Sequence, residues 1–155
     1  MIYTYFYDFP IGKIGIAATE RAISHVYFDT TTNKPKDAEI RETKLIKRAE
    51  VQLREYFNRK RKTFSLPLIF EGTSFQTMAW KALQEIPYGE VRSYKEQAIA
   101  VGNVNACRAV GMANNRNPIS IIVPCHRVVG NSGKLVGYGG GLSVKEYLLA
   151  LERRA

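Results

Sequence analysis

The residues of this chain best suited to covalent chemistry lie side by side, in the segment Pro124-Cys125-His126-Arg127. A cysteine flanked by a histidine and an arginine has the electropositive surroundings that favour a thiolate, the nucleophilic form. Adjacent side chains need not face each other, so we expect His126 to act on Cys125 through a bridging water. The alternative is a buried, unreactive thiol, which describes most cysteines in proteins.

Metal and cofactor chemistry has little support in the sequence. The chain has two cysteines, Cys107 and Cys125, and two histidines, His25 and His126. That is too few for a zinc finger, and the sequence has no C-x-x-C pair for metal or redox work. The glycine-rich segment 137–141 lacks the patterns of phosphate-binding loops. We therefore expect no metal and no cofactor, and a loop at 137–141 that walls a pocket.

The elements that must position Cys125 follow from local patterns. Residues 119–123 are apolar and β-branched, which predicts a buried strand leading to Pro124. Proline restricts the backbone here and so determines where the Cys125 side chain points. A final helix is predicted over 143–152, with Glu152 at its end. Its inward face is predicted to carry Val144, Tyr147, Leu148 and Leu151.

A helix-turn-helix unit is predicted upstream of the cysteine. Ser93 and Glu96 have capping-box spacing, which indicates the start of a short helix. Gly102 can adopt the left-handed backbone conformation that ends a helix, and Asn103 is placed to cap the next helix, over about 105–114. Two short helices joined by a glycine-containing turn are typical of DNA-binding units, although many helical hairpins bind nothing.

The second of these helices has unusually small side chains. Ala106, Ala109, Gly111 and Ala113 are small, and Arg108 is the one long cation among them. Small residues let a helix pack closely against a neighbour. They equally let it press into a narrow groove, with Arg108 projecting into the duplex to hold the space of an extruded base. The residues alone leave both interpretations open.

The first third of the chain is predicted to form an antiparallel meander followed by a helix. Segments 2–7, 13–19 and 22–28 are short and rich in aromatic and β-branched residues. His25 alternates with apolar neighbours in the third segment, so we expect it to be structural. From 37 to 58 the apolar spacing becomes helical.

These elements predict an α+β protein with two domains. A domain of antiparallel β-sheet plus helix is expected over 1–66, and a connector over 67–73. A mainly helical domain is expected over 74–155, and it holds the active-site cysteine and the helix-turn-helix at about 93–115.

The charge of the chain suits a polyanionic partner. The 155 residues carry a net charge of +9, which divides into +5 over 1–70 and +4 over 71–155. A basic surface favours nucleic acid because neutralised phosphates release counterions. The basic run 59–62 is expected to be solvated, with a direct DNA contact as the alternative. The sequence shows no membrane span and no secretory signal, which predicts a cytoplasmic protein, or a nuclear one in a eukaryote.

Together these residues resemble the O6-alkylguanine-DNA alkyltransferase family, the methylated-DNA–protein-cysteine methyltransferases. The match runs from about Phe75 to Glu152, half of the chain, and is highly specific around the cysteine. The N-terminal part matches only in outline, as the variable, ribonuclease H-like domain that such proteins carry. The matching motifs are Ser93-Tyr94, Arg108-Ala109-Val110-Gly111, Asn117-Pro118, Ile122-Val123-Pro124-Cys125-His126-Arg127-Val128-Val129 and Gly141-Leu142-Ser143-Val144-Lys145-Glu146.

The resemblance implies catalytic roles. Cys125 looks like the alkyl acceptor, with His126, a water and Glu152 as the relay that keeps it a thiolate. Asn117 is similar to the hinge asparagine that braces the turn between the reading helix and the cysteine. Tyr94 matches the tyrosine that rotates the target phosphate and donates a hydrogen bond toward guanine N3.

The resemblance also implies contacts with DNA and with the flipped base. Arg108 matches the arginine that replaces the flipped nucleotide, on a helix bound in the minor groove of double-stranded DNA. Ala106, Ala109 and Asn103 are expected to contact the DNA as well. Pocket contacts in the family are largely made by the backbone. The corresponding pocket residues here are Val128, Tyr138, Gly139 and Gly140.

The function implied is direct reversal of O6-alkylguanine, with O4-alkylthymine as a candidate second substrate. The flipped base loses its alkyl group to Cys125, and the resulting thioether resists hydrolysis, so each monomer acts once. Three alternatives remain to be tested. A non-reacting lesion-binding relative would lack the cysteine, and a helix-turn-helix regulator would leave the relay unexplained. A cysteine hydrolase would turn over an ester many times.

Two positions depart from the family pattern. Gly139 stands where serine is common, and Asn114 stands where a bulkier apolar residue is common. Because the pocket contact at 139 is made by the backbone, we expect activity to be preserved, the loop to be looser and larger alkyl groups to be admitted. The N-terminal zinc ligands of some relatives are absent from this sequence.

Overall fold

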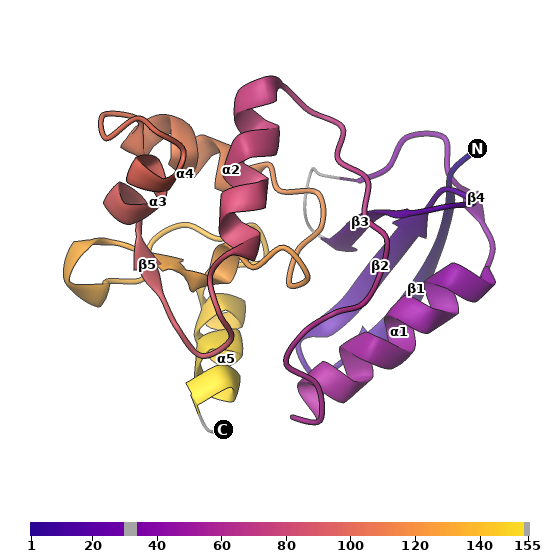
Figure 1. Ribbon diagram of the computed structural model, residues 1–155. Coiled ribbons are helices and arrows are strands. Elements are labelled where there is room, and N and C mark those ends of the chain that lie inside the picture. Colours follow the sequence, from indigo (N-terminus) through magenta and orange to yellow (C-terminus); the bar gives the residue numbers. More distant parts are fainter. Residues whose placement is uncertain (30–33, 154–155) are drawn as a thin grey trace. The chain divides into compact units, whose positions relative to one another are not determined.

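The computed structural model describes residues 1–29 and 34–153 (Figure 1). The chain forms two compact units, which are described separately. The first unit comprises Met1–Phe70 with Pro118–Ile122, and the second comprises Glu71–Asn117 with Val123–Ala155. Segment 118–122, which lies within the expected domain of 74–155, groups with the first unit because its backbone hydrogen-bonds to a strand of that unit.

The first unit is built on a four-stranded sheet in the order β3-β2-β1-β4. Strands β1 (Tyr3–Phe9), β2 (Gly12–Ala18) and β3 (Ile23–Phe28) form the predicted antiparallel meander. Gly12 has a φ of +113°, in the region that favours glycine, and so permits the tight turn between β1 and β2. Strand β4 (Glu39–Ile40) was not predicted, and it pairs with β1 in parallel.

Helix α1 (Lys44–Phe57) lies along one face of this sheet (Figure 1). Its stripe of Ile46, Ala49 and Leu53 is fully buried, as its helical spacing predicts. The predicted start at residue 37 is wrong, because the backbone of β4 is extended and hydrogen-bonded along β1. The helix begins only after Thr43, whose side-chain oxygen accepts a hydrogen bond from the Ile46 amide.

The segment before the cysteine is buried, but it is not the predicted strand. The Val26 amide of β3 donates to the Pro118 carbonyl, and the Ser120 amide donates back to the Val26 carbonyl. The chain then turns at Ile121, which has a φ of +72°. A β-branched residue rarely adopts this conformation, so the pairing ends after one bridge.

The second unit is mainly helical, with α2 (Ser74–Gln84), α3 (Tyr94–Ala100), α4 (Cys107–Asn115) and α5 (Leu142–Arg153). Two short strands, β5 (Arg92–Ser93) and β6 (Val128–Val129), pair in parallel beside them. The segments Cys125–Arg127 (η1) and Asn131–Gly133 (η2) are 3₁₀ turns. Among the helices described, none combines the length and apolar character needed to cross a membrane.

The helix-turn-helix has the predicted start and stop. Ser93 and Glu96 form a complete capping box on α3, and Gly102 has a φ of +87° just after the helix. The second helix begins later than predicted, and its N-cap residue is Ala106. Asn103 instead accepts a hydrogen bond from the Asn105 amide through its side chain, so it stabilises the turn and does not cap α4.

Candidate active site

Cys125 begins the 3₁₀ turn η1, directly after Pro124. Its side chain is only 8% exposed, and its amide donates to the Val123 carbonyl over 2.9 Å. Burial raises the pKa of the Cys125 thiol, while a hydrogen bond from Asn117 and the positive charge of Lys145 lower it by less. The expectation of a resting thiolate is therefore corrected, because burial outweighs the groups that stabilise the anion.

The sequence order suggests that Arg127 lies near the Cys125 thiol, but its guanidinium faces Glu152 instead. Its Nε donates to Glu152 Oε1 over 2.8 Å, and its Nη2 donates to Glu152 Oε2 over 3.2 Å. The remaining Nη1 donates to the Ile86 carbonyl over 2.7 Å. The guanidinium is thus buried as part of a carboxylate site, and Lys145 supplies the positive charge near Cys125.

His126 and Glu152 form a buried pair. His126 Nε2 and Glu152 Oε2 are 2.6 Å apart, and the two residues are 0% and 2% exposed. Burial alone would raise the pKa of Glu152, but the hydrogen bonds and charges of His126 and Arg127 lower it to about 2. The carboxylate is therefore ionised and accepts hydrogen bonds only, so Nε2 is the donor.

The other ring nitrogen of His126 is available for proton transfer. Within the described residues, Nδ1 is buried and has no hydrogen-bond partner. Burial lowers the pKa of His126 and Glu152 raises it, while the charges of Arg127 and Lys145 lower it further. The net effect is a lowered pKa, so the imidazole is neutral at neutral pH. With Nε2–H donated to Glu152, Nδ1 carries the lone pair that accepts a proton.

Lys145 is a site residue that the sequence analysis did not assign. Its side chain is 0% exposed, and its Nζ donates to the carbonyls of Val136 over 2.8 Å and Gly137 over 3.3 Å. A spacing of seven residues on α5 puts Lys145 on the same face as Glu152, which was the available signal. Tyr147, predicted to face inward, is 41% exposed.

Asn117 connects the end of α4 to the cysteine segment. Its Nδ2 donates to the Val123 carbonyl over 2.8 Å, and its side chain also hydrogen-bonds to Cys125. Asn117 is 3% exposed. One amide therefore restrains both the backbone that enters the cysteine turn and the thiol itself.

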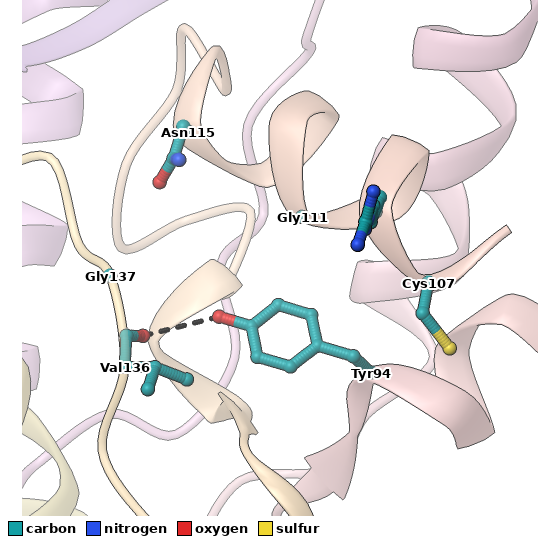
Figure 2. A pocket seen from close by; sticks show the side chains of 7 residues that line it. Tyr94, Cys107, Gly111, Asn115, Val136 and Gly137 are labelled. Atoms are coloured by element: carbon teal, nitrogen blue, oxygen red, sulfur yellow. Dashed lines mark hydrogen bonds between the residues drawn. The ribbon is translucent and has the colours of Figure 1, made fainter.

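A cavity of about 340 Å³ opens beside α4 in the second unit (Figure 2). One face of α4 lines it through Cys107, Arg108, Gly111 and Asn115, and the loop before α5 contributes the opposite wall. The Tyr94 hydroxyl donates to the Val136 carbonyl of that loop over 3.1 Å (Figure 2). Tyr94 therefore crosses the cavity from the helix-turn-helix to the loop.

Tyr94 and Tyr138 both lie in the electrostatic field of Cys125. Burial and the charge of Cys125 raise the pKa of Tyr94. Burial followed by the charges of Cys125 and Glu152 raises the pKa of Tyr138. Both phenols are therefore protonated at neutral pH and keep an O–H that can donate a hydrogen bond.

The predicted DNA-binding residues divide into two groups. Arg108 and Ala109 are exposed on α4, and Arg108 lines the cavity. Asn103 is exposed in the turn before the helix. Ala106 is 7% exposed and packs against Ala98 and Val110. Its methyl group therefore fills the core of the helix-turn-helix, and its contact with DNA stays a prediction.

The predicted pocket residues are not all placed at the cavity. Val128 is fully buried in β6, opposite Arg92. Gly139 and Gly140 belong to the loop before α5, but Val136 and Gly137 are the loop residues that line the cavity. In the described part of the chain, no group of three or more histidine, cysteine, aspartate or glutamate residues is arranged to hold a metal ion.

Comparison with known proteins gives a consistent match to each part of the chain. Residues 1–70 match the family model "6-O-methylguanine DNA methyltransferase, ribonuclease-like domain", and residues 74–154 match "6-O-methylguanine DNA methyltransferase, DNA binding domain". A Methanosarcina barkeri methylated-DNA–protein-cysteine methyltransferase is 51% identical over 146 residues, 92% of each chain. The constitutive enzyme of that name from Bacillus subtilis is 45% identical over 93% of this chain and 91% of its own.

A solved structure is similar over the same length. The crystal structure of Mycobacterium tuberculosis OGT in complex with DNA superposes with a TM-score of 0.93 at 43% sequence identity. The match covers 98% of this chain and 93% of that one. The identity and coverage of these relatives, with both family models matched in order, show that this chain belongs to the 6-O-methylguanine DNA methyltransferase family.

Proposed function

We propose that this protein repairs DNA by transferring the alkyl group of O6-alkylguanine to Cys125, once per molecule. The relatives are named methylated-DNA–protein-cysteine methyltransferases, and the M. tuberculosis protein was crystallised with DNA. The observation that carries the proposal is the buried His126–Glu152 pair next to Cys125, with Nδ1 of His126 free to accept a proton. This pair supplies the base that a protonated, buried thiol needs.

The transfer begins with the thiol proton. It passes from Cys125 Sγ to His126 Nδ1 through a bridging water, and Glu152 stabilises the imidazolium through the 2.6 Å hydrogen bond at Nε2. The thiolate then attacks the alkyl carbon in line with the carbon–oxygen bond. That bond breaks, and its electron pair leaves on guanine O6.

The leaving guanine is stabilised by hydrogen bonding. Tyr94 keeps its phenolic proton at neutral pH because its pKa is raised, so its hydroxyl can donate to the purine as negative charge develops. The proton held by His126 finally neutralises the guanine anion. The balance is a thiol plus alkylguanine giving a thioether plus guanine. The thioether has no electrophilic carbonyl, so water does not regenerate the thiol.

We assign the reading of DNA to α4. Its exposed face carries Arg108 and Ala109, which suits insertion of the helix into the minor groove. Arg108 would occupy the space that the flipped nucleotide leaves, and the target base would enter past the cavity beside it. The net charge of +9 supports binding to phosphates. A monomer is sufficient for every step.

Mass spectrometry of the intact protein tests this proposal. After incubation with a duplex containing a single O6-methylguanine, the protein should gain one methyl group, with a yield that saturates at one per molecule. Fragment mapping should place the methyl on Cys125, with Cys107 unmodified. An undamaged duplex and the Cys125→Ser variant are the controls. Absence of a mass gain, or more than one lesion repaired per protein, would refute the assignment.

A further inference from the structure

The proposed reaction uses His126 and Glu152, but it leaves the buried Arg127 without a part. Arg127 is 6% exposed, and its guanidinium contacts both oxygens of the Glu152 carboxylate. Burying an arginine costs free energy unless all of its polar contacts are good. A charge placed this close to the base is therefore a candidate to affect proton transfer.

We propose that Arg127 is a positioning residue for the transfer: it clamps the Glu152 carboxylate toward His126 and offsets its charge, so that His126 rests neutral and can accept the Cys125 proton. This inference rests on the proposed function, since it concerns the same proton transfer. It assigns Arg127 no contact with the substrate.

The clamp determines the orientation of the carboxylate. Glu152 Oε1 accepts from Arg127 Nε at 2.8 Å and, more weakly, from the Gly89 amide at 3.4 Å. Oε2 accepts from His126 at 2.6 Å and from Arg127 Nη2 at 3.2 Å. Because one guanidinium holds both oxygens, the carboxylate plane cannot rotate away from His126 without breaking both contacts.

The guanidinium is itself held from a third side. Its Nη1 donates to the Ile86 carbonyl, just beyond the end of α2, over 2.7 Å. The centre of the Tyr88 ring lies 5.7 Å from the Arg127 Cζ atom. A lysine has one ammonium in place of this fork, so it can keep the charge without making all of these contacts.

The charge of Arg127 matters because His126 faces groups of both signs. The charged groups near it are Glu152 and Lys145 on α5 and Arg127 on η1, and Cys125 is its neighbour in the chain. The anionic Glu152 raises the pKa of His126, while burial and the two cations lower it. Without Arg127, only burial and Lys145 would oppose Glu152. His126 would then be protonated more readily at rest and would lose the lone pair on Nδ1.

Two substitutions separate the charge of Arg127 from its geometry. Arg127→Met removes both the charge and the fork, and Arg127→Lys removes the fork alone. The His126 pKa is measured by NMR titration of the imidazole, and the single-turnover rate of methyl transfer is measured across the same pH range. Transfer requires neutral His126, so the rate falls as pH drops through the His126 pKa.

The methionine variant should raise the His126 pKa by on the order of one pH unit. The acidic limb of its rate profile should move to higher pH by the same amount. The lysine variant should keep the wild-type His126 pKa but transfer methyl more slowly, by about tenfold, because the carboxylate is no longer clamped. A purely structural role would lower the active fraction and leave both the pKa and the limb in place, which would overturn the inference.

The wild-type protein provides a measurement that does not depend on any variant folding. Its His126 should titrate below the ordinary value of 6.5; titration above neutral pH would overturn the inference. If only the Arg127→Lys variant folds, a raised His126 pKa in that variant would overturn the inference, because the lysine keeps the positive charge. Failure of the wild type to take up methyl refutes the proposed function instead, whereas normal uptake with an unshifted Arg127→Met profile refutes only the role of Arg127.

Discussion

Gln97 and Asn114 exchange two hydrogen bonds between the helices of the helix-turn-helix. Gln97 Nε2 donates to Asn114 Oδ1 over 3.0 Å, and Asn114 Nδ2 donates to Gln97 Oε1 over 2.8 Å. The residues are 1% and 8% exposed. The partner of Asn114 on α3 is also an amide, and the pair fixes how the two helices pack.

Breaking this amide pair should destabilise the protein more than replacing it entirely. Gln97→Leu leaves the buried Asn114 amide without this partner, and Asn114→Met leaves the Gln97 Oε1 unpaired while its Nε2 keeps the Ala79 carbonyl. Each loss costs about 1–3 kcal/mol. The double variant removes both polar groups and should recover most of that loss. Chemical denaturation of the wild type, both single variants and the double variant gives the interaction free energy. Additive losses in the double variant would contradict the pairing.

Lys145 should control how readily Cys125 ionises. Its positive charge lowers the pKa of the Cys125 thiol against the effect of burial. In Lys145→Met that pKa should rise, and alkylation of Cys125 by iodoacetamide should slow by about tenfold at neutral pH. The rate is followed at the Cys125 peptide by mass spectrometry, which separates it from Cys107.

The matched control for this variant is Lys81→Met, on the exposed side of α2. It removes the same charge from the protein without removing a buried ammonium, so the Cys125 rate should stay at the wild-type value. Equal rates in the two variants would show that Lys145 does not act on the thiol.

Local rules were enough to predict the parts of the fold that local contacts form. The capping box of Ser93 and Glu96 and the glycine stop at Gly102 depend on residues within one helical turn, and both are present. The parallel pairing of β4 with β1 depends on residues about 36 positions apart, Tyr3 and Glu39. No local pattern encodes such a pairing, so a helix was predicted there.

The site was predictable in its reactive residues but not in their surroundings. The thiol of Cys125 and the imidazole of His126 are recognisable by type and order. The contacts of Arg127 are with Ile86 and Glu152, which are 41 and 25 positions away. Only the folded chain shows that this guanidinium faces a carboxylate. It also shows that Lys145, and not Arg127, is the positive charge near the thiol.

Glu152 should make the protein lose stability in acid. Its pKa is lowered from 4.5 to about 2 in the folded state. A lowered folded pKa gives stability that is fully present above the unfolded value of 4.5 and is lost as pH falls toward 2. In Glu152→Gln the free energy of unfolding should be lower at neutral pH, because Arg127 loses its counter-charge, and should vary less between these two pH values. Glu90→Gln, at an exposed position, should keep the wild-type pH dependence, and a similar flattening in both variants would contradict the assignment.

Arg108 should matter for repair in duplex DNA and not for the chemistry itself. It is exposed at the start of α4, where it lines the cavity, and no step of the transfer uses it. Arg108→Ala should therefore slow methyl uptake from a duplex by about a hundredfold. Without Arg108, no side chain would fill the space that the flipped nucleotide leaves in the duplex. Reaction with free O6-benzylguanine, which needs no flipping, should change by less than about threefold.

Arg116→Ala, at the exposed other end of the same helix, removes an equal charge and should lower both rates little. Equal losses for duplex and free base in the Arg108 variant would mean that Arg108 supports the active site, and the finger role would then be excluded.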